Sequence, residues 1–272
     1  MELEGLTPAE RVAARFSMRG RRALVTGGSL SIGRAIVLAF ADAGAAVAVH
    51  YARAADASLG VADGAESLAK TLTAGGVPHA FVEADFAIAG EGKRAFDAAE
   101  AALGGIDVLV LCASIQQRSE FVDISDDARE QQTRVNFHAT VELLQAAVGS
   151  MRTRKWGRIL TIGSINQSRP EPTLAVYAAL KSAQYNLTLN LARQLADTGI
   201  TVNNLSPGLV ATARNRWRRE DEDAWRQIQF SANPMHRAAT PEEMTGAALL
   251  LCSEAGRFIT GIDLPVTGGG HL

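Results

Sequence analysis

The sequence predicts a doubly wound α/β fold, in which one parallel sheet is covered by helices on both faces. Short apolar runs alternate with helix-like segments almost without exception along the chain. The runs are apolar at successive positions, as expected of strands that are buried on both faces of a parallel sheet. The 272 residues are enough for one large domain of this kind, and no repeat or domain boundary interrupts them.

The chain begins with a short helix of its own. Thr7 and Glu10 form a capping box with Pro8 at the first helical position, which predicts a helix that ends near Phe16. We expect this amino-terminal helical extension, residues 1–20, to pack on the main body without a chemical role. It is charged and lacks the apolar core of a signal peptide.

The main domain, residues 21–272, carries about seven expected strands and six helices. Strands are expected at Arg22–Thr26, Ala46–Tyr51, Val77–Ala84, Asp107–Cys112, Gly157–Ile162, Ile200–Leu205 and Ile262–Val266. Helices are expected at Ile32–Ala43, Ala65–Ala74, Ala87–Leu103, Asp126–Met151, Leu174–Asp197 and Thr240–Cys252. The segment near 210–239 breaks the alternation and is polar, which is typical of a lid or binding loop.

The composition excludes several classes of function. A net charge of −2 gives no basic excess for nucleic acid, and no apolar run is long enough for a membrane span. Cys112 and Cys252 lie in apolar runs and are expected to be buried free thiols, so a cytoplasmic location is predicted. No metal site is expected.

The stretch VTGGSLSIGRA, residues 25–35, predicts a phosphate-binding turn between the first strand and the first helix. Gly27, Gly28 and Gly33 let the backbone approach a pyrophosphate closely, and the helix that follows offers free N–H groups. A Gly/Ser-rich turn without a ligand is the alternative for this stretch taken alone. Its place in a strand–turn–helix unit favours nucleotide binding.

YAALK places Tyr177 and Lys181 on one face of a helix. An ammonium near a phenol lowers the pKa of the tyrosine, which suits a general acid near neutral pH. A chance pair is the alternative, but Ser164 ends the fifth strand at the carboxyl edge of the same sheet. Its hydroxyl can bond the same substrate oxygen.

These motifs, together with SPGLVAT from Ser206 to Thr212, resemble the classical short-chain dehydrogenases/reductases. The resemblance runs from about Arg21 to Gly270 and implies a single-domain Rossmann-type fold. It implies that Ser164, Tyr177 and Lys181 are catalytic. Asn136 in RVNFHA completes the family's tetrad, and by resemblance it holds a water that links Lys181 to solvent.

The same resemblance implies hydride transfer between a nicotinamide and a carbonyl or alcohol carbon. Contacts to the cofactor are then expected from Gly27, Ser29, Ser31, Ile32, Gly33, Tyr51, Arg53, Asp85, Phe86, Cys112, Ala113, Ser114, Tyr177, Lys181, Pro207, Gly208, Val210 and Thr212.

Two departures from the family pattern stand out. Ser31 occupies the middle glycine of the family's TGxxxGxG loop, and we expect the loop to bind if the backbone angles at Ser31 suit a residue with a Cβ. In LCAS, Cys112 replaces an Asn and Ser114 replaces a Gly. These changes are expected to alter the local geometry beside the cofactor more than the reaction itself.

The second strand predicts the choice of cofactor. Family members that prefer NAD carry an acid at its end, where this chain has Tyr51, and Arg53 follows. A guanidinium suits a 2′-phosphate, so NADP(H) is favoured over NAD(H). The alternatives are that Arg53 is a solvated cation, or that Asp56 reaches the ribose and restores NAD.

The substrate is the least determined property. The lid carries Arg214, Arg216, Arg218 and Arg219, which either bind an anionic substrate or acidic carrier protein, or form a solvated charged helix. The leading hypothesis is a 3-oxoacyl-[acyl-carrier-protein] reductase of fatty acid biosynthesis, with acyl carrier protein as a candidate partner. A dehydrogenase of a sugar, polyol or other small secondary alcohol is the second hypothesis, and a non-catalytic cofactor-binding regulator the third. The resemblance also implies a homotetramer paired through the two long helices.

Overall fold

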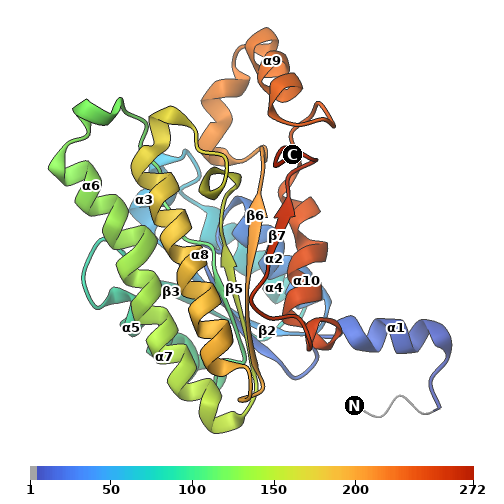
Figure 1. Cartoon of the computed structure of the whole chain (residues 1–272). Helices are drawn as coiled ribbons and strands as arrows, with labels where there is room; N and C mark the ends of the chain where they lie inside the picture. The colour runs from blue at the N-terminus through green and yellow to red at the C-terminus, as the bar shows by residue number, and fades with distance from the viewer. Residues whose placement is uncertain (1–4) are drawn as a thin grey trace.

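The computed structural model describes residues 5–272, which form one domain around a single parallel sheet (Figure 1). The strand order is β3-β2-β1-β4-β5-β6-β7, and every pairing is parallel. The strands are β1 Arg22–Thr26, β2 Ala46–Tyr51, β3 His79–Glu83, β4 Val108–Leu111, β5 Gly157–Ile162, β6 Ile200–Pro207 and β7 Asp263–Val266. The predicted doubly wound fold with seven strands is therefore confirmed.

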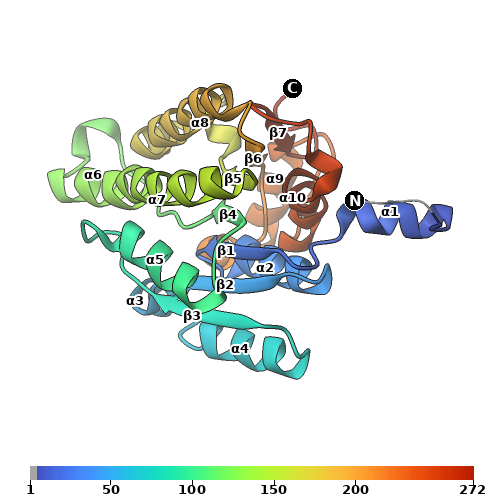
Figure 2. The same cartoon turned by 90° about the horizontal axis from the view of Figure 1, so that it is seen from below.

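Helices cover the sheet on both faces, as the view from below shows (Figure 2). One layer holds α5 (Glu91–Leu103), α6 (Asp126–Thr133), α7 (Ala139–Arg154) and α8 (Ala175–Leu195), and the other holds α2 (Ser31–Asp42), α4 (Gly64–Ala74) and α10 (Thr245–Cys252). None of the helices in residues 5–272 has both the length and the apolar character that crossing a membrane requires.

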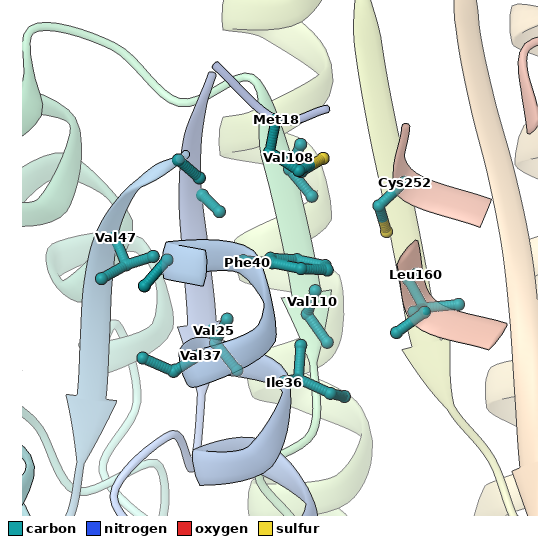
Figure 3. Close-up of a cluster of buried hydrophobic side chains, with 14 of the residues drawn as sticks. Met18, Val25, Ile36, Val37, Phe40, Val47, Val108, Val110, Leu160 and Cys252 are labelled. Atoms are coloured by element: carbon teal, nitrogen blue, oxygen red, sulfur yellow. The ribbon is translucent and has the colours of Figure 1, made fainter. Parts of the chain in front are cut away.

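Each face of the sheet buries its own apolar cluster. On the α2 side, Phe40 and Ile36 of α2 pack with Val25 of β1 and Val110 of β4 (Figure 3). On the other side, Phe96 of α5 belongs to a second cluster with residues of β4, α7 and β6. Because the strands are apolar on both faces, the sheet is rigid where the connecting loops leave it.

The long helix expected at Asp126–Met151 is interrupted. The segment Arg134–His138 forms a π-helical turn between α6 and α7. Such turns occur frequently at functional sites, and this one carries Asn136. Periodicity alone does not reveal one extra residue in a turn, because the flanking helices keep their own apolar faces.

The connections also contain helices that the sequence pattern did not predict. Helix α3 (Arg53–Ser58) follows β2 directly. The lid folds into a 3₁₀ helix, η5 (Ala213–Arg219), and α9 (Glu222–Ala232). Figure 1 shows α9 beyond the carboxyl end of β6.

The amino-terminal helix α1 (Pro8–Phe16) has the expected capping box, in which Thr7 and Glu10 bond each other's backbone N–H groups. It buries none of its residues and projects from the side of the domain (Figure 1). It contacts the rest of the chain at η7 (Glu254–Gly256).

Candidate active site

The site forms where β1 and β4 lie side by side and their connections depart toward opposite faces of the sheet. In open α/β sheets, ligands bind at this switch point, beyond the carboxyl ends of the strands. Thr26 ends β1, and its hydroxyl accepts the N–H groups of Cys112 and Ala113 at 3.0 and 3.1 Å. The glycine loop and the loop after β4 are therefore joined at the base of the crevice.

The glycine loop leaves no room for side chains at its close approaches. A Cβ on Gly33 would lie 2.1 Å from the backbone oxygen of Gly27, so only glycine fits there. Gly27 itself has a φ of +61°, and its Cβ position is 3.0 Å from Ala113 Cα. No side chain caps the amino end of α2, whose first turn also carries no acid. These features fit a cofactor phosphate at the helix terminus.

Ser31 lies in the left-handed region that favours glycine, with a φ of +49°. A residue with a Cβ in this left-handed region costs about 1–2 kcal/mol. The Ser31 hydroxyl accepts the backbone N–H of Ala213 in the lid at 3.3 Å. The angles are thus those of glycine, and the hydroxyl bond partly offsets their cost.

His50, in β2, supports the glycine loop from below, and sequence analysis missed it. Its Nδ1 accepts the Gly27 N–H at 3.1 Å, so its Nε2 is the nitrogen that donates to the Ala84 carbonyl, also at 3.1 Å. The ring stacks on Phe86 with centroids 3.9 Å apart. Burial lowers the pKa of His50 to about 4. A histidine inside the apolar run AVAVHY was the available signal, because a buried polar group needs partners.

The side chains at the end of β2 form a charged cluster on the surface. Arg53 bonds Glu66 at 2.7 Å, Glu83 at 3.4 Å and the Tyr51 hydroxyl at 3.2 Å. Its charge is therefore balanced by two carboxylates, while half of its side chain stays exposed to solvent. These hydrogen bonds raise the pKa of the Arg53 guanidinium, with Glu66 as the main cause.

Asp56, the alternative ribose ligand, is turned inward instead. Its carboxylate accepts the Ser29 hydroxyl at 2.7 Å, and both side chains are buried. Burial raises the pKa of Asp56. Asp56 thus braces the glycine loop against α3.

Asp85 and Phe86 follow β3 beside the crevice. The Asp85 carboxylate accepts the Ala87 N–H at 2.9 Å, and Phe86 is buried against His50. Across the crevice, burial raises the pKa of the half-buried Cys112 to about 11. Cys112 is therefore a neutral thiol at physiological pH.

The structure brings Asn136 to the loop after β4. Its amide donates to the Ile115 carbonyl at 2.8 Å and accepts the Ile115 N–H at 2.9 Å. Its backbone carbonyl accepts the Thr140 hydroxyl at 3.1 Å. The π-helical turn thus fixes this loop against α7, and the amide keeps one N–H and one lone pair for a further partner.

Ser164 lies just past the end of β5 and is buried. Its hydroxyl oxygen accepts the Asn166 N–H at 3.2 Å and donates to no group in residues 5–272. Its O–H is therefore available to a substrate oxygen.

Tyr177 and Lys181 lie on the first two turns of α8, and both are buried. The Lys181 ammonium donates to the Ile162 carbonyl at 2.7 Å and to Gln184 at 3.0 Å, and lies 5.8 Å from the Tyr177 ring centroid. Burial lowers the pKa of Lys181 to about 8. The Tyr177 hydroxyl makes no hydrogen bond within the part of the chain that the structure describes. Lys181 thus ties the first turns of α8 to the end of β5, two residues before Ser164.

A buried polar network stands behind the serine. Asp263 of β7 accepts hydrogen bonds from Asn204 and Ser206 of β6, each at 2.7 Å. Its other oxygen accepts the Gln167 amide at 2.8 Å, and Gln167 accepts the Ser164 N–H at 3.5 Å. The turn that carries Ser164 is thereby anchored to the last strand.

The segment after β6 returns over the crevice. Pro207 ends β6, Gly208 follows, and Val210 is buried where its bridge to Ala239 closes the base of the lid. A Cβ on Gly208 would lie 2.9 Å from Thr267 Cα, so this turn is packed tightly.

Thr212 begins η5, and its carbonyl accepts Arg219 at 2.9 Å. Arg214 reaches across to Ser114, donating to its carbonyl at 2.5 Å and to its hydroxyl at 3.1 Å. The guanidinium groups of Arg214 and Arg219 are therefore hydrogen-bonded within the chain and are not simply solvated, in contrast to the second alternative for the lid arginines.

Comparisons with known proteins agree with this geometry. A family model described as "Enoyl-(Acyl carrier protein) reductase" matches residues 27–271. Acetoacetyl-CoA reductase of Allochromatium vinosum is 32% identical over 251 residues, which are 92% of this chain and 98% of the relative. A solved 3-oxoacyl (acyl-carrier-protein) reductase from Agrobacterium tumefaciens C58, with NADP bound, is 39% identical, with a TM-score of 0.89 over 96% of this chain and 98% of that one. A putative NAD(P)-dependent gluconate 5-dehydrogenase from Beutenbergia cavernae, with bound NADP, is 35% identical, with a TM-score of 0.85 over 94% of this chain and 98% of that one.

Proposed function

Because the chain belongs to the short-chain dehydrogenase/reductase family, we propose that it is an NADP(H)-dependent reductase of 3-oxoacyl thioesters. The observation that carries the chemistry is the hydrogen bond from Lys181 to the Ile162 carbonyl. This bond holds the helix of Tyr177 at the end of β5, where Ser164 is buried. The thioester substrate is supported by relatives named as acetoacetyl-CoA and 3-oxoacyl reductases.

The proposed division of labour follows from each side chain's surroundings. The bound nicotinamide supplies the hydride. Tyr177 protonates the carbonyl oxygen, because its phenol is buried at the site and otherwise unengaged within residues 5–272. Ser164 donates its free O–H to the same oxygen and orients it. Lys181, held by the Ile162 carbonyl, keeps a positive charge beside the phenol.

Asn136 is proposed to hold the water through which Lys181 reaches solvent. Its amide retains one donor and one acceptor after bonding Ile115, which is enough for that water.

NADP(H) is proposed as the cofactor, since Tyr51 stands where an acid would bind the ribose 2′-hydroxyl and Arg53 lies beside it. Arg53 would hold the 2′-phosphate after giving up its ion pair with Glu66 or Glu83. Structural relatives that contain NADP support this choice.

A second candidate function is the oxidation of a small hydroxy acid, which the likeness to a putative gluconate 5-dehydrogenase favours. The deciding experiment follows oxidation of NADPH and of NADH with a short 3-oxoacyl thioester. Turnover with NADPH supports the proposal. NADPH binding without thioester turnover, together with NADP reduction by aldonates or polyols, contradicts it and selects the second candidate.

A Tyr177→Phe variant separates catalysis from mere cofactor binding. It should bind NADPH like the wild type and lose nearly all turnover, by about 10²-fold or more. Undiminished turnover would contradict the assigned proton donor.

A homotetramer paired through the α6–α7 segment and α8 is proposed from the family resemblance, with acyl carrier protein as a candidate partner. Light scattering on the purified chain tests the assembly, and a monomer would refute it.

A further inference from the structure

The two family glycines that this chain replaces by serine both bond the lid, at consecutive residues. Ser31 accepts the N–H of Ala213 at 3.3 Å. Ser114 accepts the guanidinium of Arg214 at 3.1 Å through its hydroxyl and at 2.5 Å through its carbonyl. A glycine at either position has no hydroxyl to offer. The departures from the family pattern therefore share one structural consequence, which is to hold the start of η5 over the crevice.

Arg214 brings a positive charge to this place without a balancing carboxylate. Within residues 5–272 it forms no ion pair, whereas Arg226 on the same lid pairs with Asp223 at 2.8 Å. Arg214 is half-buried. Burial is the main cause of the lowered pKa of Lys181, and the nearby charge of Arg214 lowers it further. A partly desolvated guanidinium that has a lysine near it and no carboxylate partner is stabilised by an anion.

The position of that guanidinium is set by three loops. Ser31 begins α2, whose amino end has no side-chain cap. Ser114 follows β4, and the glycine loop touches the residue before it, Ala113. Arg214 thus stands at the crevice between β1 and β4, beside a positive helix terminus. Two positive features at one place match a diphosphate better than a single carboxylate.

We propose that Arg214 is a cofactor-binding residue that takes the diphosphate of NADP(H), and that Ser114 and Ser31 are positioning residues that hold it over the crevice. The proposal rests on the proposed use of a nicotinamide cofactor. It does not depend on which carbonyl substrate is reduced.

The test measures NADPH binding by fluorescence titration without substrate. An Arg214→Met variant should bind NADPH about 10- to 100-fold more weakly, as expected for the loss of a charged hydrogen bond. Arg226→Met is the matched control, an exposed lid arginine with its own acidic partner, and should bind NADPH like the wild type.

A second probe separates lost recognition from a damaged site. Adenosine 2′-monophosphate lacks the diphosphate, so Arg214→Met and the wild type should bind it equally well. Ser114→Ala should weaken NADPH by a few-fold, and this loss should vanish when Arg214 is already Met, because the two groups act as a pair.

Three results would overturn the proposal. Equal NADPH affinity in the Arg214 and Arg226 variants would remove Arg214 from the cofactor site. Equal weakening of both probes would make its role structural. If Arg214→Met kept its NADPH affinity and only its KM for an anionic substrate rose, Arg214 would be assigned to substrate binding. Failure of the wild type to turn over 3-oxoacyl thioesters refutes only the proposed substrate, while failure to bind NADPH refutes both proposals.

Discussion

Replacing His50 by phenylalanine isolates the part of the stability that depends on a neutral buried imidazole. The folded protein holds His50 with a pKa of about 4, because burial penalises its charged form. In the unfolded chain the ordinary value is about 6.5. Between these two values the unfolded state binds a proton that the folded state does not, so stability falls as the pH falls from 6.5 to 4.

The size of the effect follows from the two pKa values. The full difference between 6.5 and about 4 corresponds to about 3 kcal/mol, of which about 2 kcal/mol is lost by pH 5. His50→Phe keeps an aromatic ring against Phe86 but does not titrate. It also leaves the N–H of Gly27 and the carbonyl of Ala84 unpaired, which lowers stability at every pH.

The assay is urea unfolding followed by tryptophan fluorescence at pH 7.5 and pH 5. The wild type should lose about 2 kcal/mol more of its free energy of unfolding than His50→Phe does over this interval. A parallel fall in the wild type and His50→Phe would refute the reasoning.

Three further predictions concern the site. The pKa of about 8 at Lys181 predicts that reduction slows as the pH rises through 8 and the ammonium loses its proton; Lys181→Arg should abolish this break in the pH profile of kcat/KM, and a break that persists would contradict the assignment. Gly33→Ala places a Cβ 2.1 Å from a backbone oxygen and should weaken NADPH binding by about 100-fold or more in a fluorescence titration. The control Gly149→Ala has open space around its Cβ, so it should bind NADPH normally and gain up to about 1 kcal/mol in its free energy of unfolding. Glu66→Gln removes the main partner of Arg53 and should tighten NADPH but not NADH; equal effects on both cofactors would separate Arg53 from the 2′-phosphate.

Much of the fold could be predicted because its determinants are local. The strands are short, mostly apolar runs, and some helices have a cap or a glycine stop, such as Ser125 before α6 and Gly104 after α5, which has a φ of +73°. The shared helix face of Tyr177 and Lys181, the proposed catalytic pair, followed from their spacing.

The remaining features depend on contacts between distant segments. No local pattern reveals that Arg214 reaches a residue one hundred positions earlier, or that Arg53 lies between two carboxylates. The π-helical turn at Asn136 reflects packing against the loop after β4, which propensity does not encode. The positive φ of Ser31 is a further example, because only the glycine that the family has at this position predicts it.

The anchoring of the Ser164 turn by Asp263 has a consequence for the order in which the enzyme matures. Strand β7 is the last strand of the sheet to leave the ribosome, after the glycine loop and all of the catalytic side chains. Until it docks beside β6, Gln167 lacks the carboxylate that holds it beneath the serine. A nascent chain arrested before Asp263 therefore contains all of the proposed catalytic side chains, but its serine turn is not anchored. We therefore expect activity only after synthesis of the last strand is complete.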